Sequence, residues 1–357
     1  MERLQRLRQS LTKQDFDVLL VSQPANRRYL SGFTGSTGWL LILASKALLA
    51  VDFRYVEQAK QETPDFDVIH IKGDITSWLP KLASDMGCNR IGFEADQTSF
   101  STYQQLCETT NNMSHLQFVP TTGLVEQLRM VKDMQELNLI AGAANMADKA
   151  IDHAKSLIRP GKTEKEIAWE LEKFLREQGS ENLPFDIIIA SGPNSALPHA
   201  RPSERRILEG EPIVIDIGAR ISGYCSDLSR TLYLGNEDKT FSRIYDTVLG
   251  AQLTGLATIV SGMSGDQADK LSRTVIEQEG YGEVFGHGLG HGVGLETHEA
   301  PRLGPNSADI LADGMVFTIE PGVYLQGWGG IRIEDTVVAE NGKLRSLSRA
   351  DKIASIH

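Results

Sequence analysis

Five side chains between residues 216 and 334 have the chemistry of metal ligands: Asp216, Asp227, His291, Glu320 and Glu334. Four carboxylates and one imidazole form an oxygen-rich set, which is suited to manganese, cobalt or zinc and is unlike a thiolate site. Four negative charges balance two divalent ions, so charge counting favours two metals over one. Two metals about 3.5–4 Å apart can bridge a water molecule and deprotonate it at neutral pH.

The first two acids lie in the run IVIDIGARISGYCSDLSRT, which reads as two β-rich segments around a short turn. An antiparallel hairpin with its two-residue tip at Ile221 and Ser222 would place Asp216 directly opposite Asp227. Opposed residues on one face of a sheet have Cβ atoms roughly 4.5–5.5 Å apart. Two carboxylates at that distance repel each other, so the hairpin predicts a cation between them.

Glu320 and Glu334 interrupt runs that are otherwise apolar and β-branched, in VFTIEPGVY and GGIRIEDTVV. An unpaired carboxylate is costly in such a setting. Taken singly, each of these acids is more often salt-bridged or hydrogen-bonded than bound to a metal, because structural ion pairs also perturb acids. Five candidate ligands, each within its own glycine-rich or β context, favour the metal interpretation.

The motifs resemble those of a known group of enzymes. Two aspartates separated by ten residues, followed by GHGLGHGVGLETHE, TIEPGVY and RIEDT, look like the pita-bread metallopeptidases. This group comprises Xaa-Pro aminopeptidases, prolidases, methionine aminopeptidases and the metal-free creatinases. The resemblance covers the whole C-terminal part and, more loosely, the N-terminal part. It implies an α/β protein of two domains, with a small creatinase-type N-terminal α/β domain and a C-terminal pita-bread α+β catalytic domain.

The resemblance also implies a role for each site residue. His291 and Glu320 would hold one metal, Asp216 the second, and Asp227 and Glu334 would bridge both. Glu320 would also shuttle a proton from the water to the leaving nitrogen. The remaining catalytic or substrate-binding positions implied by the resemblance are His199 and His298, which contact the substrate carbonyl and the tetrahedral intermediate, His287, which lines the pocket, and Arg332, which orients site carboxylates.

Other catalytic chemistries fit the sequence less well. Cys225 and Ser226 stand beside Asp227, but no GxSxG elbow surrounds them. We therefore expect Cys225 to be a strand residue that faces away from the site. The helical metalloprotease signature HExxH is absent too, because His298 and Glu299 are followed by Ala-Pro without a second histidine.

The resemblance, together with the five filled ligand positions, implies a dinuclear metallo-exopeptidase, most simply with manganese and with cobalt or zinc as alternatives. Its substrates would be peptides with proline at the second position, cleaved from the N-terminus as an Xaa-Pro aminopeptidase does; an Xaa-Pro dipeptidase (prolidase) is the alternative. A methionine aminopeptidase is disfavoured, because this chain has roughly 126 N-terminal residues that this branch of the family typically lacks. A metal-free creatinase-like hydrolase or a non-catalytic binding protein should have lost site residues, whereas all five ligand positions are filled.

Composition sets the remaining limits. The chain has 357 residues, 41% of them hydrophobic and 23% charged, as expected for a globular protein of two domains. A net charge of −11 argues against nucleic acid or an anionic membrane as partner. Three cysteines without CxxC spacing, and an N-terminus without a signal peptide, predict a reduced, cytoplasmic setting. A homodimer is expected from the resemblance.

We place the domain boundary near Glu126, giving domains of residues 1–126 and 127–357. Strands alternate with helices in the first domain, and the apolar stretch from Trp39 to Val51 is too short to span a bilayer, so it predicts a hairpin. The loop SGFTGSTG lacks the lysine of a phosphate-binding loop. The resemblance implies that this loop lies near the active site of a neighbouring subunit. Together with the motif VDFRY, the loop looks more like the N-terminal domains of Xaa-Pro aminopeptidases than those of many prolidases.

The second domain begins with a predicted long helix from Leu124 to Pro160. Thr163 and Glu166 form a capping box for the next helix. Further helices are predicted over 241–260 and 267–279. Strand-rich segments over 211–231 and 317–338 both carry candidate ligands, so a helix pair followed by acid-bearing strands occurs twice. This order is consistent with a pseudo-symmetric fold.

Overall fold

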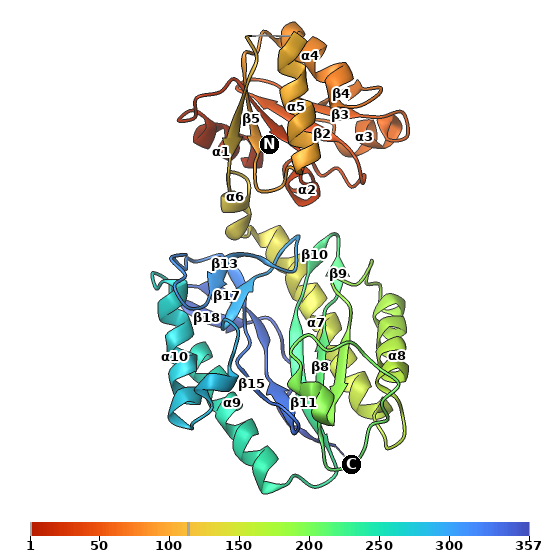
Figure 1. Ribbon diagram of the computed structural model, residues 1–357, viewed down its shortest axis with the longest axis vertical. Helices are drawn as coiled ribbons and strands as arrows, with labels where there is room; N and C mark the ends of the chain where they lie inside the picture. The colour runs from red at the N-terminus through yellow and green to blue at the C-terminus, as the bar shows by residue number, and fades with distance from the viewer. Residues whose placement is uncertain (1, 113–114, 357) are drawn as a thin grey trace. The chain divides into compact units, whose positions relative to one another are not determined.

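The computed structural model describes residues 2–112 and 115–356; Met1, residues 113–114 and His357 lie outside the described residues. The chain divides into two compact units, Met1–Arg129 and Met130–His357, each with its own elements (Figure 1). We describe each unit by itself.

The N-terminal unit is built on a mixed sheet with the strand order β4-β3-β2-β1-β5-β6. Its strands are β1 (Val18–Val21), β2 (Trp39–Leu43), β3 (Ala47–Val51), β4 (Asp67–His70), β5 (Arg90–Glu94) and β6 (Gln117–Thr121). The pairings β1–β2 and β2–β3 are antiparallel, whereas β3–β4, β1–β5 and β5–β6 are parallel. The hairpin predicted between Trp39 and Val51 is therefore confirmed.

Helices connect these strands: α1 (Glu2–Leu11), α2 (Pro24–Ser31), α3 (Val56–Glu62), α4 (Ile75–Met86) and α5 (Phe100–Asn112). Sequence reasoning missed α2, although Pro24 stands in its first turn and Gly32 ends it in a left-handed conformation (φ 80°), which is the usual asymmetry of helix ends. Arg27 on this helix donates hydrogen bonds to the carbonyls of Gly35 and Ser36, both 3.1 Å. A buried side chain thus shapes the glycine-rich loop.

The long helix predicted from Leu124 to Pro160 is wrong, because the structure has two helices there, α6 (Glu126–Met130) and α7 (Met134–Leu157). Asp133 accepts hydrogen bonds from the backbone N–H groups of Gln135 and Glu136, and the Glu136 carboxylate accepts one from the backbone N–H of Asp133. This capping box starts a new helix. Helix propensity alone could not locate the break, since the residues on both sides favour helix. The capping box predicted at Thr163 and Glu166 is confirmed at the start of α8 (Glu164–Glu177).

The C-terminal unit contains two main sheets with the orders β19-β11-β8-β7 and β13-β12-β14-β17-β18, and the smaller pairs β10-β9 and β15-β16. The strands of the first half are β7 (Ile188–Ser191), β8 (Pro212–Ile217), β9 (Arg220–Ile221), β10 (Tyr224–Cys225) and β11 (Leu228–Leu234). Those of the second half are β12 (Gly290–Gly292), β13 (Glu299–Leu303), β14 (Val316–Ile319), β15 (Gly322–Leu325), β16 (Gly329–Arg332), β17 (Asp335–Glu340), β18 (Lys343–Ser346) and β19 (Ser355–Ile356).

Each half has its own pair of helices. α7 packs on α8, and α9 (Lys239–Thr258) packs on α10 (Gly265–Gln278). In Figure 1 the two pairs lie on opposite sides of the strands of this unit. The repeated order of helix pair and acid-bearing strands, predicted from the sequence, is thus present in the structure.

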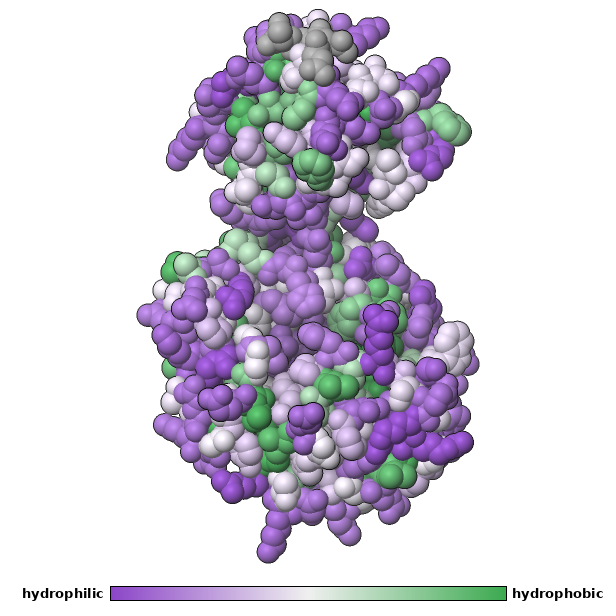
Figure 2. Space-filling view, in the orientation of Figure 1, coloured by the Kyte–Doolittle hydropathy of each residue, from purple (hydrophilic) through white to green (hydrophobic). Residues whose placement is uncertain are grey.

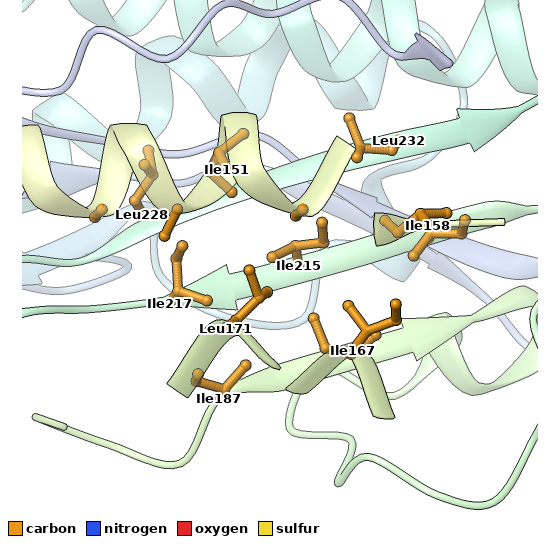
Figure 3. Close-up of a cluster of buried hydrophobic side chains, with 14 of the residues drawn as sticks. Ile151, Ile158, Ile167, Leu171, Ile187, Ile215, Ile217, Leu228 and Leu232 are labelled. Carbon is orange, nitrogen blue, oxygen red and sulfur yellow. The ribbon is translucent and has the colours of Figure 1, made fainter. Parts of the chain in front are cut away.

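A core of aliphatic side chains holds the first half together (Figure 3). Ile151 of α7 and Leu171 of α8 pack with Ile215 of β8 and Leu232 of β11, and all four side chains are almost fully buried. Fully burying one such side chain contributes about 1.5–3 kcal/mol. This packing fixes β8, which carries Asp216, and β11, which begins directly after Asp227.

The surface is largely hydrophilic, with hydrophobic side chains scattered over both units in the face that Figure 2 shows. Within the part of the chain that the structure describes, no helix is both long and apolar enough to cross a membrane.

Candidate metal centre and active site

The two aspartates lie on one face of the β8–β11 ladder, but in a register that differs from the predicted one. Asp216 pairs with Ser229, and the same register continued by one residue places Asp227 opposite Gly218. The tip of the hairpin consists of Ser222 (φ 48°) and Gly223 (φ 85°). A two-residue turn of this kind needs positive φ at both positions. Glycine adopts positive φ readily, whereas a β-branched residue such as Ile221, in the predicted tip, does not.

The predicted direct opposition of Asp216 and Asp227 is therefore wrong, although both residues still lie on one face of the sheet. The shift is two residues, and side chains in a strand alternate with a period of two. Asp216 and Asp227 consequently remain on the same face, as diagonal neighbours.

His291 lies on β12 and is oriented by its own backbone neighbour. Its Nδ1 is 3.1 Å from the carbonyl oxygen of Gly292. A carbonyl can only accept, so Nδ1 carries the hydrogen and Nε2 presents its lone pair. That Nε2 is 3.3 Å from Oε1 of Glu320 and 3.7 Å from Oδ2 of Asp227. A neutral histidine fixed in one tautomer in this way is the usual form of a metal ligand.

Glycines bring the strand of His291 close to its neighbours. A Cβ on Gly290 would lie 2.0 Å from the carbonyl oxygen of Thr318, and one on Gly292 would lie 2.2 Å from that of Ala300. No side chain larger than hydrogen fits at either position. The glycines of GHGLGHG thus allow β12 to sit between β13 and β14.

The two glutamates follow strands of the second half. Glu320 comes directly after β14, its backbone N–H donates to the carbonyl of Leu289 (2.8 Å), and its Oε1 accepts from the Thr318 hydroxyl (3.0 Å). Glu334 lies between β16 and β17 and is buried, and its N–H donates to the carbonyl of Ser229 (3.1 Å). The last contact joins the second half of the unit to the strand beside Asp227.

The structure brings the five predicted ligands together around one cavity. Ligand atoms of Asp227, His291 and Glu334 all lie within 4.8 Å of one another. Burial raises the pKa of both Asp227 and Glu334 well above its ordinary value, and the carboxylates of the site raise the two pKa values further by repulsion. Oδ1 of Asp216 is buried and has no hydrogen-bond partner among the described residues. Buried acidic oxygens that repel one another fit divalent cations.

Arg332 supplies the positive charge nearest to these acids. Its Nη2 donates to Oδ2 of Asp216 (2.6 Å), its Nε to the Ser229 hydroxyl (2.8 Å), and its Nη1 to the Tyr324 hydroxyl (3.0 Å). Arg332 is almost fully buried. It holds one oxygen of Asp216, whereas the other has no hydrogen-bond partner among the described residues.

Tyr324 links Arg332 to His287, and sequence reasoning missed it. The Tyr324 hydroxyl is 2.9 Å from Nε2 of His287, whose Nδ1 is 2.8 Å from the carbonyl oxygen of Gly288. Since that carbonyl accepts from Nδ1–H, Nε2 accepts from the tyrosine, which in turn accepts from Arg332. Tyr324 follows Glu320 by four residues in the sequence, but no spacing rule singles it out as a site residue.

The cavity measures about 470 Å³, a size suited to a small ligand. Apolar side chains form part of its wall, and Arg201 and Arg302 belong to its lining. The histidines predicted to contact substrate, His199, His287 and His298, all line it as well.

His298 lies beside the candidate ligand His291, with ring centroids 4.1 Å apart. Burial, together with the neighbouring His291, lowers the pKa of His298 to about 4. Its imidazole is therefore neutral at physiological pH and can donate a hydrogen bond through one nitrogen only.

Cys225 takes no part in the lining of the cavity. It is buried, and its Sγ contacts the carbonyl oxygens of Gly223 and Leu295. Burial raises the pKa of the Cys225 thiol to about 11, so very little thiolate forms at neutral pH. The Ser226 hydroxyl accepts from the N–H of Ala219 (3.1 Å). Both observations agree with the expectation that neither residue is a nucleophile.

Comparison with known proteins places these features in context. Residues 138–341 match Metallopeptidase family M24, and residues 3–131 match the Creatinase/Prolidase N-terminal domain. A solved structure of an Xaa-Pro dipeptidase from Bacillus anthracis is 41% identical, with a TM-score of 0.96 over 100% of this chain and 99% of that one.

Two further relatives are similar over nearly their full length. The X-Pro aminopeptidase of Thermotoga maritima is 38% identical, with a TM-score of 0.88 over 96% of this chain and 98% of that one. An Xaa-Pro dipeptidase of Pyrococcus furiosus is 36% identical over 96% of this chain and 97% of its own.

Proposed function

The chain belongs to metallopeptidase family M24 and carries a creatinase/prolidase N-terminal domain, and from this premise we propose that it is an Xaa-Pro exopeptidase with two divalent metal ions. The predicted family and two-domain fold class are confirmed. The substrate, the number and identity of the metals, and the role of each residue are our proposal.

The convergence of the five candidate ligands carries this proposal. As the family resemblance implies, His291 and Glu320 would hold one ion, Asp216 the other, and Asp227 and Glu334 both. Two observations support this assignment: Oδ1 of Asp216 is buried without a hydrogen-bond partner among the described residues, and ligand atoms of Asp227, His291 and Glu334 lie close together. We propose manganese, with cobalt or zinc as alternatives for this donor set. When bound, such ions supply Lewis acidity and lower the pKa of a water molecule.

The protein groups around the ligands have separate tasks. Burial raises the pKa of Glu320, so this carboxyl group can accept a proton from water and hold it until it passes to the leaving nitrogen. His298 and His199 line the same cavity, where an imidazole N–H stabilises the oxyanion that develops on the scissile carbonyl. Arg332 and Tyr324 keep Asp216 and His287 in place.

Between the two substrate classes, we propose Xaa-Pro dipeptides as the main substrates. Relatives named Xaa-Pro dipeptidase at 41% and 36% identity support this choice over the aminopeptidase first expected, although the Thermotoga relative is named an aminopeptidase. The cavity supports it too, because Arg201 and Arg302 in its lining can attract a free carboxylate, which follows the proline only in a dipeptide.

The test compares Leu-Pro, Leu-Pro-Gly and Leu-Ala as substrates, each with Mn²⁺ and with EDTA. We expect Mn²⁺-dependent release of proline from Leu-Pro, a kcat/KM at least about tenfold lower for Leu-Pro-Gly, a difference of about 1.4 kcal/mol, and little cleavage of Leu-Ala. Faster cleavage of the tripeptide would favour the aminopeptidase alternative. Equal rates with and without metal would overturn the proposal.

A cytoplasmic setting and a homodimer also remain proposals. Cys88, Cys107 and Cys225 are free thiols, which agrees with a reducing compartment. Fractionation of cells that produce the protein and sedimentation velocity of the purified chain test the two expectations separately.

A further inference from the structure

A buried ion pair lies next to the proposed active site without belonging to the cavity lining. Nζ of Lys132 is 2.7 Å from Oε1 of Glu299, and the two side chains are only 1% and 7% exposed. The residues are 167 positions apart in the sequence. Glu299 directly follows His298, one of the histidines that line the cavity.

The lysine end of this pair is anchored in regular backbone structure. The N–H of Lys132 donates to the carbonyl of Gly314 (2.8 Å), and Val131 forms an antiparallel bridge with Met315. Nζ also donates to the carbonyl of Met130 (3.3 Å). Since α7 begins two residues later, the backbone of Lys132 is held between a helix start and the segment that precedes β14.

The glutamate end fixes the turn that joins the two histidines. Glu299 pairs with Gly292, the residue after His291, across β12 and β13. Its Oε1 passes so close to Gly294 that a Cβ there would lie 2.3 Å away. The carbonyl of Gly294 accepts from the N–H of Cys225 (2.8 Å), which precedes the candidate ligand Asp227 by two residues.

His298 itself has little else to hold it. No hydrogen bond fixes its ring among the residues that the structure describes, and its side chain is exposed to the cavity. Its place beside the His291 ring, with 4.1 Å between centroids, therefore depends on the backbone of residues 293–299. The carboxylate of Glu299 ties that backbone to Lys132.

Stability alone does not account for such a pair. Taking two charges out of water costs about as much as their attraction returns, whereas removing one partner leaves a buried charge uncompensated. The pair therefore adds little net stability compared with apolar side chains, but it strongly restricts where Glu299 can lie.

We propose that the Lys132–Glu299 ion pair positions His298 for its contact with the substrate. Both members act through His298 and touch no substrate themselves, so they are positioning residues. The catalytic consequence rests on the proposed peptidase function. A displacement of about 1 Å of a catalytic group can cost about 100-fold in rate, so loss of the pair has a large effect on kcat.

The test is a set of variants with E299Q, K132M and the double substitution K132M/E299Q, assayed with Mn²⁺ and Leu-Pro. We expect kcat to fall about 10- to 100-fold in all three, with KM changed less than about threefold. The double variant, in which neither member of this pair is charged, should regain thermal stability. Its kcat should stay low, because the anchor is still missing.

A second set places E299Q in an H298N background. If Glu299 acts through His298, the effects are not additive, and E299Q lowers the residual kcat of H298N by less than about twofold. E340Q serves as the matched control, because Glu340 forms an exposed ion pair with Arg345 at 2.7 Å and should leave kcat unchanged. Equal losses in both backgrounds, or a kcat that returns with stability in K132M/E299Q, would overturn the positioning role.

Hydrogen exchange of the metal-free protein gives a readout independent of activity. Peptides that cover residues 293–299 should exchange at least about tenfold faster in K132M/E299Q than in the unaltered chain. In the control E340Q they should exchange at the same rate as in the unaltered chain. Unchanged exchange would contradict the proposal whether or not the chain cleaves Leu-Pro. An unaltered chain without activity, but with this local loss of protection in the double variant, would refute the peptidase function and the catalytic consequence while leaving the anchoring itself supported.

Discussion

Arg332 holds one oxygen of Asp216 and leaves the other without a partner. Nη2 of the arginine donates to Oδ2 over 2.6 Å, whereas the buried Oδ1 has no hydrogen bond among the described residues. A carboxylate clamped on one side is pre-oriented for a cation on the other. This asymmetry distinguishes Asp216 from an ordinary salt-bridged acid, for which both oxygens are satisfied.

The substitution R332K should separate charge from geometry. Lysine keeps the positive charge but cannot reach Asp216, Ser229 and Tyr324 together, as the planar guanidinium does. We expect kcat/KM to fall about 100-fold, equivalent to about 2.7 kcal/mol, with weaker binding of the ion held by Asp216, measured by calorimetric titration of Mn²⁺. R345K, on an exposed arginine, is the control. Unaltered metal binding in R332K would rule out the proposed clamp.

Y324F tests the contact between Arg332 and His287. The substitution removes a hydroxyl that accepts from Nη1 of Arg332 (3.0 Å) and donates to Nε2 of His287 (2.9 Å). Two buried polar groups then lose a partner. The loss should lower the free energy of unfolding by about 1–3 kcal/mol for each group, and kcat should fall about tenfold. Chemical denaturation and steady-state kinetics measure the two effects. Y281F, at a partly exposed tyrosine, should change neither, and a fully active, equally stable Y324F would show that the hydroxyl is dispensable.

Removal of metal should make stability fall as pH rises. Burial and mutual repulsion raise the pKa of Asp227 and Glu334 above the ordinary carboxyl value of about 4. Above that value the unfolded chain releases these protons first, so the native state binds more protons and the free energy of unfolding decreases with pH. Burial lowers the pKa of His298 to about 4, so this histidine acts in the opposite direction below the ordinary histidine pKa of about 6.5. We expect the Tm of EDTA-treated protein to decrease between about pH 6.5 and 8, and Mn²⁺ to offset the decrease by binding the native state.

D227N provides the control for this pH dependence. The amide removes one of the two repelling charges, so metal-free D227N should be more stable than the metal-free unaltered chain at pH 8 and should show a shallower decrease. It should also lose the stabilisation by Mn²⁺. Identical slopes for the two proteins in EDTA would mean that these acids do not repel each other in the fold.

Alkylation should distinguish the cysteines. The pKa of Cys225 is raised to about 11 by burial, so the thiolate form is scarce at pH 8, whereas Cys107 is exposed. We expect iodoacetamide at pH 8 to label Cys107 within minutes and to leave Cys225 unlabelled in the native protein, with peptidase activity retained. Mass spectrometry of tryptic peptides measures the labelling. Fast modification of Cys225 would reopen the question of a nucleophilic role.

Much of the candidate site could be predicted because its residues interrupt patterns that otherwise describe strands. Asp216, Glu320 and Glu334 each stand within or beside apolar β runs, and the structure places all of them at one cavity. The hairpin was predicted with the correct faces but the wrong register. The position of Gly223 at the tip depends on backbone conformation, which the apolar pattern does not encode.

Contacts between distant segments could not be predicted in the same way. Tyr324 and Lys132 have no local signal, because their roles depend on His287 and Glu299 lying beside them in space. The break between α6 and α7 was missed for another reason. Helix propensity favours both sides of it, whereas the capping box of Asp133 and Glu136 starts a separate helix at Met134.

Anomalous diffraction from crystals of the protein grown with Mn²⁺ tests the central claim most directly. The account predicts two peaks about 3.5–4 Å apart, one beside His291 and Glu320 and the other beside Oδ1 of Asp216, with Asp227 and Glu334 reaching both. A single peak, or manganese bound away from these five side chains, would contradict it.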